Sequence, residues 1–229
     1  MSQSVLIVGA GSGLSASLAR QCHTAGMKVA LAARDGEKAI AVAKETGASL
    51  HSCDASSIED VAALFTALDD SIGTPDLVVY NPSARLRGPI TELDPEATRA
   101  AIETTCFGAF LVAQQAARQM LARGSGSILF TGASAGVKGF ANSSVFAMGK
   151  FGLRGLAQSL ARELHPQNIH IGHFVIDGGI ASDRPDRQDD GGDQMLDPDA
   201  IAEAYLQFHN QHRSAWAWEV ELRPWVETF

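Results

Sequence analysis

A glycine-rich turn near the N-terminus has recognisable chemistry. The apolar run Val5–Val8 leads into the turn, and a helical pattern follows. Glycine permits a tight turn, and the free N–H groups at a helix start attract phosphate oxygens. The spacing matches neither GxGxxG nor a P-loop, but it matches GxxxGxG with Ser15 in place of the third glycine. We predict a dinucleotide-binding turn rather than a purely structural one, with these contacts: Gly9, Ser12, Gly13 and Leu14.

The residues after the next two apolar runs bear on the choice of nucleotide. Ala33 occupies the end of the second run, where an acid would bind a free ribose 2′-hydroxyl, and Arg34 follows it. An arginine there suits a 2′-phosphate, so we expect NADP(H) in preference to NAD(H). Asp35 could instead hold Arg34 in a surface ion pair. Asp54 could accept a hydrogen bond from the adenine amino group, or it could be the N-cap of the following helix.

These residues must be positioned by a regular alternation of short apolar runs and helical stretches. Continuously apolar runs indicate strands buried on both faces, and βα repetition predicts an α/β fold with a doubly wound parallel sheet of about seven strands. We expect one domain over residues 1–229. The strand candidates are Ser4–Val8, Lys28–Ala33, Ser49–Cys53, Leu77–Tyr80, Ser127–Thr131 and His170–Ile176. The helix candidates are Leu14–Ala25, Gly36–Thr46, Ile58–Ser71, Pro95–Ala122 and Ser144–Leu164.

One segment departs from this alternation. Ser182–Asp199 is rich in Asp, Gly and Pro, a composition typical of a mobile, solvated loop. It follows the last long strand candidate, at the sheet edge where such folds bind ligands, so it is also a candidate substrate lid. After it we expect an amphipathic helix over Pro198–His212. We expect the tail Trp216–Phe229 to form a last strand and an aromatic end that packs against the domain.

The composition of the chain argues against several kinds of partner and site. The net charge of −8 argues against nucleic-acid and anionic-membrane partners. An odd number of widely spaced cysteines suggests a reducing compartment, and we expect a cytoplasmic protein. No Cys or His spacing suggests a metal site, and no segment approaches the roughly 18 apolar residues of a membrane span. We therefore expect a small-molecule substrate.

Taken in order, the motifs make the chain resemble the short-chain dehydrogenase/reductase family over essentially its whole length. The glycine turn resembles the family's TGxxxGxG, Tyr80–Ser83 its NNAG, Lys150 the lysine of its YxxxK, and Asp177–Ile180 its PG motif. The resemblance implies a Rossmann-type domain that binds a nicotinamide dinucleotide and transfers hydride to or from a carbonyl carbon. It adds these nucleotide-binding residues to those above: Ala55, Asn81, Pro82, Lys150, Gly178 and Ile180.

The resemblance also implies a catalytic tetrad of Asn, Ser, Tyr and Lys, which this chain keeps only in part. The Asn falls on Thr105, the Ser on Ala133 (or Ser134 with a shift of one residue), the Tyr on Phe146 and the Lys on Lys150. A phenyl ring has no proton to exchange, so the chain resembles a divergent branch with FxxxK in place of YxxxK. Lys150 could still hold the nicotinamide ribose, although a surface position on its helix is the alternative.

Another group would then have to supply the proton. The candidates are Ser134, Asp177, water and the substrate itself; Asp177 could equally be a turn or cap residue. We expect Tyr80 and Tyr205 to be packed side chains, and His173 to be a core histidine rather than a base.

Two functions follow from these observations. The first is an NADP(H)-dependent oxidoreductase that acts on a small carbonyl or alcohol with an unusual proton donor. The second is a non-catalytic nucleotide-binding sensor or interaction protein that lost the chemistry. We favour the first by analogy with the family. Ala- and Leu-rich faces on Pro95–Ala122 and Ser144–Leu164 predict a homodimer or homotetramer.

Overall fold

A parallel sheet forms the centre of the computed structural model, which describes residues 2–182, 187–188 and 191–227. Among these residues the sheet has seven strands in the order β3-β2-β1-β4-β5-β6-β9. β1 and β4 are buried at every position because helices cover both faces, whereas β3 lies at an edge and is half-buried. The strands are β1 Ser4–Val8, β2 Lys28–Ala33, β3 Ser49–Ser52, β4 Leu77–Tyr80, β5 Gly126–Thr131, β6 Ile169–Ile176 and β9 Glu219–Leu222.

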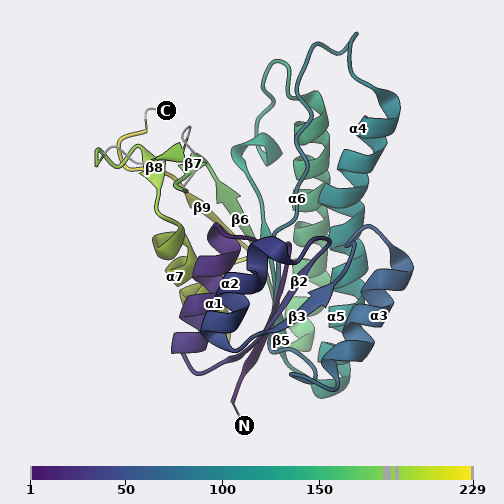
Figure 1. Cartoon of the computed structure of the whole chain (residues 1–229), viewed down its shortest axis with the longest axis vertical. Helices are drawn as coiled ribbons and strands as arrows, with labels where there is room; N and C mark the ends of the chain where they lie inside the picture. The colour runs from purple at the N-terminus through teal and green to yellow at the C-terminus, as the bar shows by residue number, and fades with distance from the viewer. Residues whose placement is uncertain (1, 183–186, 189–190, 228–229) are drawn as a thin grey trace.

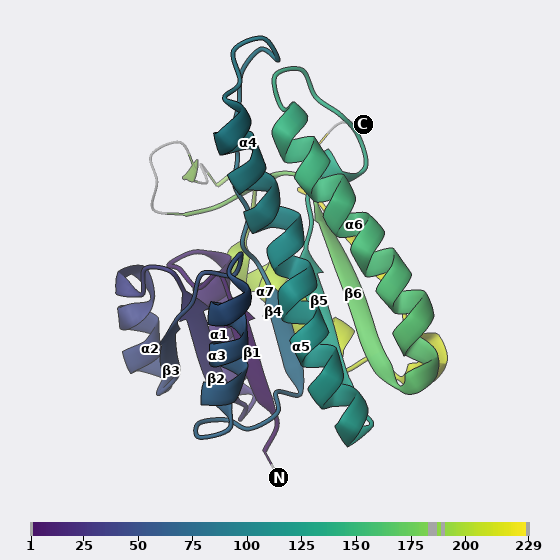
Figure 2. The same ribbon diagram turned by 90° about the vertical axis from the view of Figure 1, so that its right-hand side faces the viewer.

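Helices lie in two layers around this sheet (Figure 1). One face is covered by α1, α2 and α7, the other by α3, α5 and α6, and each layer buries its own apolar cluster. Figure 2 shows α4 and α5 following one another end to end, with α6 running beside them on the second face. The expected α/β doubly wound fold is confirmed. The helices are α1 Leu14–Thr24, α2 Ile40–Thr46, α3 Ile58–Leu68, α4 Pro95–Ile102, α5 Gly108–Arg123, α6 Ser144–Leu164 and α7 Pro198–His209.

The helix predicted over Pro95–Ala122 is present and helical without a gap, but it is not a regular α-helix throughout. A π-helical turn over Glu103–Phe107 separates α4 from α5. It packs against glycines of α6: a Cβ added to Gly149 would lie 2.9 Å from Cβ of Thr105, and one added to Gly152 would lie 2.7 Å from Sγ of Cys106. This close approach depends on residues more than 40 positions away, so a local pattern carries no sign of it.

Several predicted helices and strands were also longer than the observed ones. The helix expected over Gly36–Thr46 begins as a 3₁₀ turn at Glu37–Ala39, and α7 ends at His209 rather than His212. In the described part of the tail, β9 is the one strand. Trp225 is 80% exposed, so this aromatic residue does not pack against the domain as predicted; its indole N–H donates to Asp193 at 2.9 Å instead, while Phe229 lies outside the described residues.

The segment expected to be a lid is described only in part. Residues 183–186 and 189–190 lie outside the described residues. On either side of them the two-residue strands β7 (Gly179–Ile180) and β8 (Met195–Leu196) pair in parallel. The base of the segment is therefore attached at the carboxyl end of β6. Its action as a lid stays a prediction.

Candidate active site

Two adjoining cavities open where the parallel strands end. The larger, of about 710 Å³, is lined by residues that follow β1, β4, β5 and β6. The smaller, of about 360 Å³, lies toward β2 and β3, and both cavities share Asn81 and Ser83. The order of the strands reverses between β1 and β4, and open α/β sheets bind ligands at such a point.

The glycine-rich turn separates the two cavities. Ser12, Gly13 and Leu14 line the larger one, and Gly9 lines the smaller one. Gly9 has a φ of +83°, and a Cβ there would lie 2.7 Å from the backbone nitrogen of Pro82. Only glycine is compatible with this backbone conformation and this close approach.

Ser15 has a structural reason to replace the third glycine of the motif. Its buried hydroxyl donates to the carbonyl oxygen of Gly9 at 2.9 Å and accepts from the Asn81 side-chain amide at 2.8 Å. These two hydrogen bonds connect the glycine-rich turn to Asn81, the residue that follows β4. With no side chain at Gly13 and α1 beginning at Leu14, backbone N–H groups and the positive end of the helix dipole face the cavity, so this turn fits a diphosphate.

The smaller cavity brings together the residues predicted to select the nucleotide. Arg34, Asp54 and Ala55 line it, and so does Lys38, which the sequence analysis missed. Asp35 does not pair with Arg34 among the described residues; its carboxylate accepts from the backbone N–H of Glu37 at 3.0 Å. Two cationic side chains at the end of β2 suit a 2′-phosphate.

Asp54 is not the helix N-cap considered as its alternative role. Ser57 is the N-cap of α3, accepting from the N–H of Asp60 at 3.1 Å. Asp54 lies on the cavity wall and accepts from the hydroxyl and N–H of Ser56 at 2.6 and 2.9 Å. These hydrogen bonds, with a contribution from Arg34, hold the pKa of Asp54 below its usual value.

Lys150 lies in the inner wall of the larger cavity. It is 2% exposed, so the alternative of a surface helix lysine is wrong. Its ammonium donates to the carbonyl oxygen of Thr131 at 2.6 Å and lies 5.8 Å from the centroid of the Phe146 ring, one helical turn earlier. Burial, followed by the nearby Arg85 guanidinium, lowers the pKa of Lys150 to about 7.

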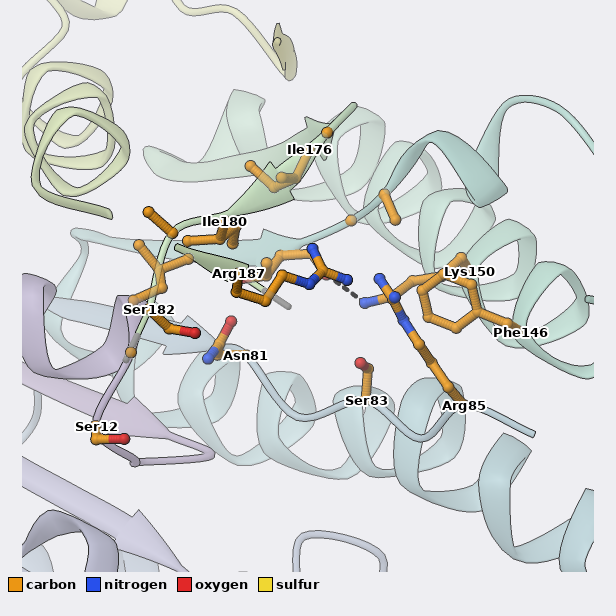
Figure 3. Close-up of a pocket in the computed structure, with 17 residues that line it drawn as sticks. Ser12, Asn81, Ser83, Arg85, Phe146, Lys150, Ile176, Ile180, Ser182 and Arg187 are labelled. Carbon is orange, nitrogen blue, oxygen red and sulfur yellow. Dashed lines mark hydrogen bonds between the residues drawn. The ribbon is translucent and has the colours of Figure 1, made fainter. Parts of the chain in front are cut away.

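Two arginines that the sequence analysis did not select complete this end of the cavity. Arg85 comes from the segment after β4 and lies 4.5 Å above the Phe146 ring, while Arg187 comes from the segment after β7. Figure 3 shows the nitrogen-bearing ends of Arg85, Lys150 and Arg187 gathered in one part of the cavity. A local pattern could not have found the arginines, because they are far apart in the sequence and only the fold brings them together.

The other predicted cofactor contacts also lie on the cavity walls. Gly178 and Ile180 line the larger cavity, and Pro82 lines the smaller one. The two other candidate proton donors, Ser134 and Asp177, are not among the described residues that line either cavity. Ser134 belongs to a 3₁₀ turn whose preceding residue, Ala133, lines the cavity in its place. Asp177 is absent from the described lining and pairs with Arg223 at 3.2 Å and Lys138 at 3.6 Å.

The remaining candidates are core residues, as predicted. Tyr80 and Tyr205 are completely buried, and the Tyr205 hydroxyl donates to Thr131 at 2.9 Å. His173 is also completely buried and pairs through Nδ1 with Glu219 at 3.0 Å, but its Nε2 has no hydrogen-bond partner among the described residues. Thr105, at the Asn position, accepts from the N–H of Ala84 at 3.1 Å.

Comparisons with known proteins agree with this geometry. Residues 3–188 match the family model described as short chain dehydrogenase. The chain belongs to this family. It is 30% identical to the 3-oxoacyl-(acyl-carrier-protein) reductase MabA of Mycobacterium tuberculosis over 183 residues, which cover 80% of this chain and 71% of the relative.

Two solved structures extend the likeness. A short-chain dehydrogenase from Rhodopseudomonas palustris is 35% identical with a TM-score of 0.84, over 97% of this chain and 99% of that one. A metagenomic short-chain oxidoreductase solved in complex with NADP is 28% identical with a TM-score of 0.84, over 97% of each chain. Short-chain dehydrogenases are NAD(P)-dependent oxidoreductases, and the cavity residues of this member fit such a nucleotide.

The part of the chain that the structure describes contains no cluster of metal-ligating side chains. It also contains no helix with the length and hydropathy needed to cross a bilayer.

Proposed function

We propose that this protein is an NADP(H)-dependent oxidoreductase that acts on a small carbonyl compound or alcohol, with a proton donor other than tyrosine. The supporting observation is the pair of joined cavities, with the glycine turn between them and buried Lys150 in the wall of the larger one. MabA is named as a reductase and the metagenomic relative was solved with NADP, which agrees with this class of reaction.

In this proposal each cavity holds one half of the nucleotide. Arg34 and Lys38 bind the adenosine phosphate, Asp54 accepts from the adenine amino group, and the N–H groups after Gly13 bind the diphosphate. When bound, the nicotinamide supplies or accepts the hydride. Lys150 binds the nicotinamide ribose, and Ile180 and Gly178 form the wall beside it.

Lys150 is also the proposed proton source. Of Lys150, Ser134 and Asp177, it alone lines the cavity among the described residues. Its ammonium carries three N–H bonds, of which one is used on the Thr131 carbonyl, so another can move a proton to a substrate oxygen in the cavity. Loss of that proton leaves a neutral amine, which regains a proton from water.

Nucleotide selection tests the cofactor half of the proposal. We expect the parent protein to bind NADPH more tightly than NADH, and Arg34→Ala to lose about tenfold or more of its NADPH affinity, since a charge-assisted bidentate contact disappears. Affinity for NADH should change little. Fluorescence titration with each nucleotide measures this. Lys44→Ala, on nearby α2 and outside both cavities, is the matched control; equal losses for both nucleotides would contradict the assignment of Arg34.

A non-catalytic nucleotide-binding protein is the second candidate, and the observation in its favour is Phe146 in the tyrosine position. The two candidates differ in turnover. Suppose that the parent and Phe146→Tyr both bind NADPH tightly, and that neither consumes it with any of a panel of carbonyl compounds. That result would support the non-catalytic nucleotide-binding protein. Activity that appears only in Phe146→Tyr would show that the rest of the site is competent.

We also propose that the segment over 182–199 closes over the substrate.

We propose, in addition, that the protein is a homodimer or homotetramer. The outer faces of α5 and α6 and the turn before α5 expose the apolar side chains Phe107, Phe110, Leu121, Met148 and Phe151. An exposed apolar patch of this kind is typical of an interface between subunits. Sedimentation velocity is expected to give a mass of two or four chains; a monomer at micromolar concentration would contradict the proposal.

A further inference from the structure

Thr131 connects two helices that lie on opposite faces of the sheet. Its carbonyl oxygen accepts from the Lys150 ammonium of α6 at 2.6 Å, and its hydroxyl oxygen accepts from the Tyr205 phenol of α7 at 2.9 Å. Thr131 is the last residue of β5 and lines the larger cavity. One residue in the cavity wall is therefore bound both to the proposed proton source and to a buried phenol.

The backbone at Thr131 has a strand neighbour on one side only among the described strands. The pairing of β4 with β5 ends at Phe130, whereas the pairing of β6 with β5 reaches Thr131, which lies opposite Phe174. The carbonyl that Lys150 binds therefore belongs to the point where β5 leaves the sheet. Side-chain contacts matter more for the backbone there than in the middle of a strand, because fewer ladder hydrogen bonds fix the chain.

Tyr205 is itself held firmly by its surroundings. Its side chain is completely buried, and its ring stacks on Phe174 with a centroid distance of 3.7 Å and an interplanar angle of 19°. Thr131 is the one hydrogen-bond partner of the Tyr205 hydroxyl among the described residues. Because burial and stacking fix the phenol, its hydroxyl can fix the side chain of Thr131.

Lys150 depends on the same residue. Its ammonium is buried, and the Thr131 carbonyl is its one hydrogen-bond acceptor among the described residues. The titratable groups that interact with it electrostatically in the described part of the chain are Arg85, from the segment after β4, and His173, from β6. Neither is an acid, so the carbonyl is the group that favours the charged ammonium at this position.

We propose that Tyr205 is a positioning residue for Lys150, and that it acts through Thr131. The phenol fixes the hydroxyl of Thr131, and the carbonyl of the same residue fixes the ammonium where it can reach a substrate oxygen. This inference rests on the proposed function, in which Lys150 supplies the proton. Tyr205 contacts neither nucleotide nor substrate in this arrangement, since it is absent from the described lining of both cavities.

Tyr205→Phe removes the hydroxyl and keeps the stacked ring. NMR titration of the Lys150 ammonium, assigned by comparison with Lys150→Met, is expected to give a lower midpoint in this variant than in the parent. The reason is that the charged form loses part of its hydrogen bond when Thr131 is less firmly held. With NADPH and a carbonyl compound that the parent reduces, kcat is expected to fall about threefold to tenfold, the effect of one ordinary hydrogen bond.

Tyr80→Phe is the matched control for the loss of a buried phenolic hydroxyl. Tyr80 is also completely buried, and its hydroxyl donates to the carbonyl oxygen of Thr104, away from Lys150. Both variants should lose a similar amount of stability, but the Lys150 titration should keep its parental midpoint in Tyr80→Phe. The same lower midpoint in both variants would indicate a general effect of lost stability and would contradict the role of Tyr205.

Replacement of Thr131 tests whether Tyr205 acts through it. Thr131→Val removes the hydroxyl and preserves the branched shape, so the lower midpoint is expected again, and adding Tyr205→Phe should change it little further. Thr131→Ser keeps a hydroxyl and should give a midpoint near that of the parent. Effects of Tyr205→Phe and Thr131→Val that simply add in the double variant would contradict the connection through Thr131.

The outcomes separate this inference from the proposed function. A parental Lys150 titration in Tyr205→Phe would overturn the inference, whatever the effect on kcat. A lower midpoint with parental kcat would support the positioning role and contradict Lys150 as the proton source. A parent protein that binds NADPH tightly and reduces no carbonyl compound would overturn the oxidoreductase, while a lower Lys150 midpoint in Tyr205→Phe would still support the positioning role.

Discussion

Lys150→Met is expected to lower kcat for carbonyl reduction by about 10²–10⁴-fold, the usual contribution of a general acid. The variant removes the titratable group that is buried in the cavity wall, and methionine fills a similar volume without a proton. Because reduction needs the ammonium form, the parental kcat/KM should fall as the pH rises through about 7, the lowered pKa of Lys150. The oxidation of an alcohol needs the neutral amine and should show the opposite slope.

Two further measurements separate a proton donor from a structural lysine. Nitrogen-detected NMR of the Lys150 ammonium, assigned by comparison with Lys150→Met, should show titration near pH 7. Because the folded-state pKa lies below 10.5, the ordinary pKa of a lysine side chain, burial of the charged form destabilises the fold below pH 7, and this cost disappears as the pH rises toward 10.5. Lys150→Met should therefore unfold at a higher temperature than the parent at pH 6.

Lys138→Met is the control for the loss of a cation near the site. Lys138 is 55% exposed, pairs with Asp177 and does not line the cavity, so its replacement should leave kcat and the pH profile unchanged. Parental kcat in Lys150→Met would show that the proton comes from water or from the substrate.

Folding stability is expected to fall steeply between pH 6.5 and pH 4. Burial lowers the pKa of both His170 and His173 from 6.5 to about 4, so the unfolded chain binds more protons than the folded chain within this interval. Above pH 6.5 both imidazoles are neutral in either state and the full stability is present; it is lost as the pH falls toward 4. Two protons correspond to about 3 kcal/mol per pH unit, a large share of a typical free energy of unfolding.

The surroundings of each histidine support this expectation. The His170 ring is stacked between Phe208 and Trp216, with both centroid distances 4.4 Å, and its Nδ1 has no partner among the described residues. Lys150 and Arg154 add to the effect of burial on His173, whereas Glu219 opposes it. Protonation of either ring would place a charge in a site built for a neutral imidazole.

Urea unfolding measured from pH 7 to pH 4 tests this, with His170→Phe as the informative variant. Phenylalanine preserves the aromatic stack and removes the titration, so the pH dependence should decrease by about one proton. The variant gives up the hydrogen bond between His170 Nε2 and the carbonyl of Ala217, which should lower stability at pH 7 by about 1 kcal/mol. His23→Gln, at an exposed position of α1, is the control; the same slope in His170→Phe and the parent would contradict the explanation.

The larger features of the fold could be predicted because they depend on local periodicity. β1, β2, β4 and α6 have the bounds that the sequence pattern predicted, since buried parallel strands are continuously apolar and turn residues interrupt the runs. The π-helical turn between α4 and α5 was missed because a periodic apolar pattern continues across it, while the glycines that it packs against, Gly149 and Gly152, are distant in the sequence.

The location of the proposed nucleotide-binding residues on the cavity walls could be predicted for a related reason. A dinucleotide is bound largely by backbone groups at strand ends and at a helix start, and glycine spacing together with strand ends predicts where these occur. Arg34 belongs to such a position, immediately after β2. By contrast Ser134 and Asp177 were chosen for their chemistry and their nearness to a motif, and nearness in sequence does not determine which way a side chain points.

By itself, then, the amino-acid sequence determined the doubly wound sheet, the glycine-rich turn after its first strand and the absence of a phenol four residues before Lys150. Only the tertiary structure decided that Lys150 is buried, that Asp177 is held in ion pairs, and that Arg85 and Arg187 join Lys150 at one cavity. The reason is physical: periodicity and turn chemistry act over a few neighbouring residues, whereas burial, charge and pKa depend on groups that the chain brings together from distant positions.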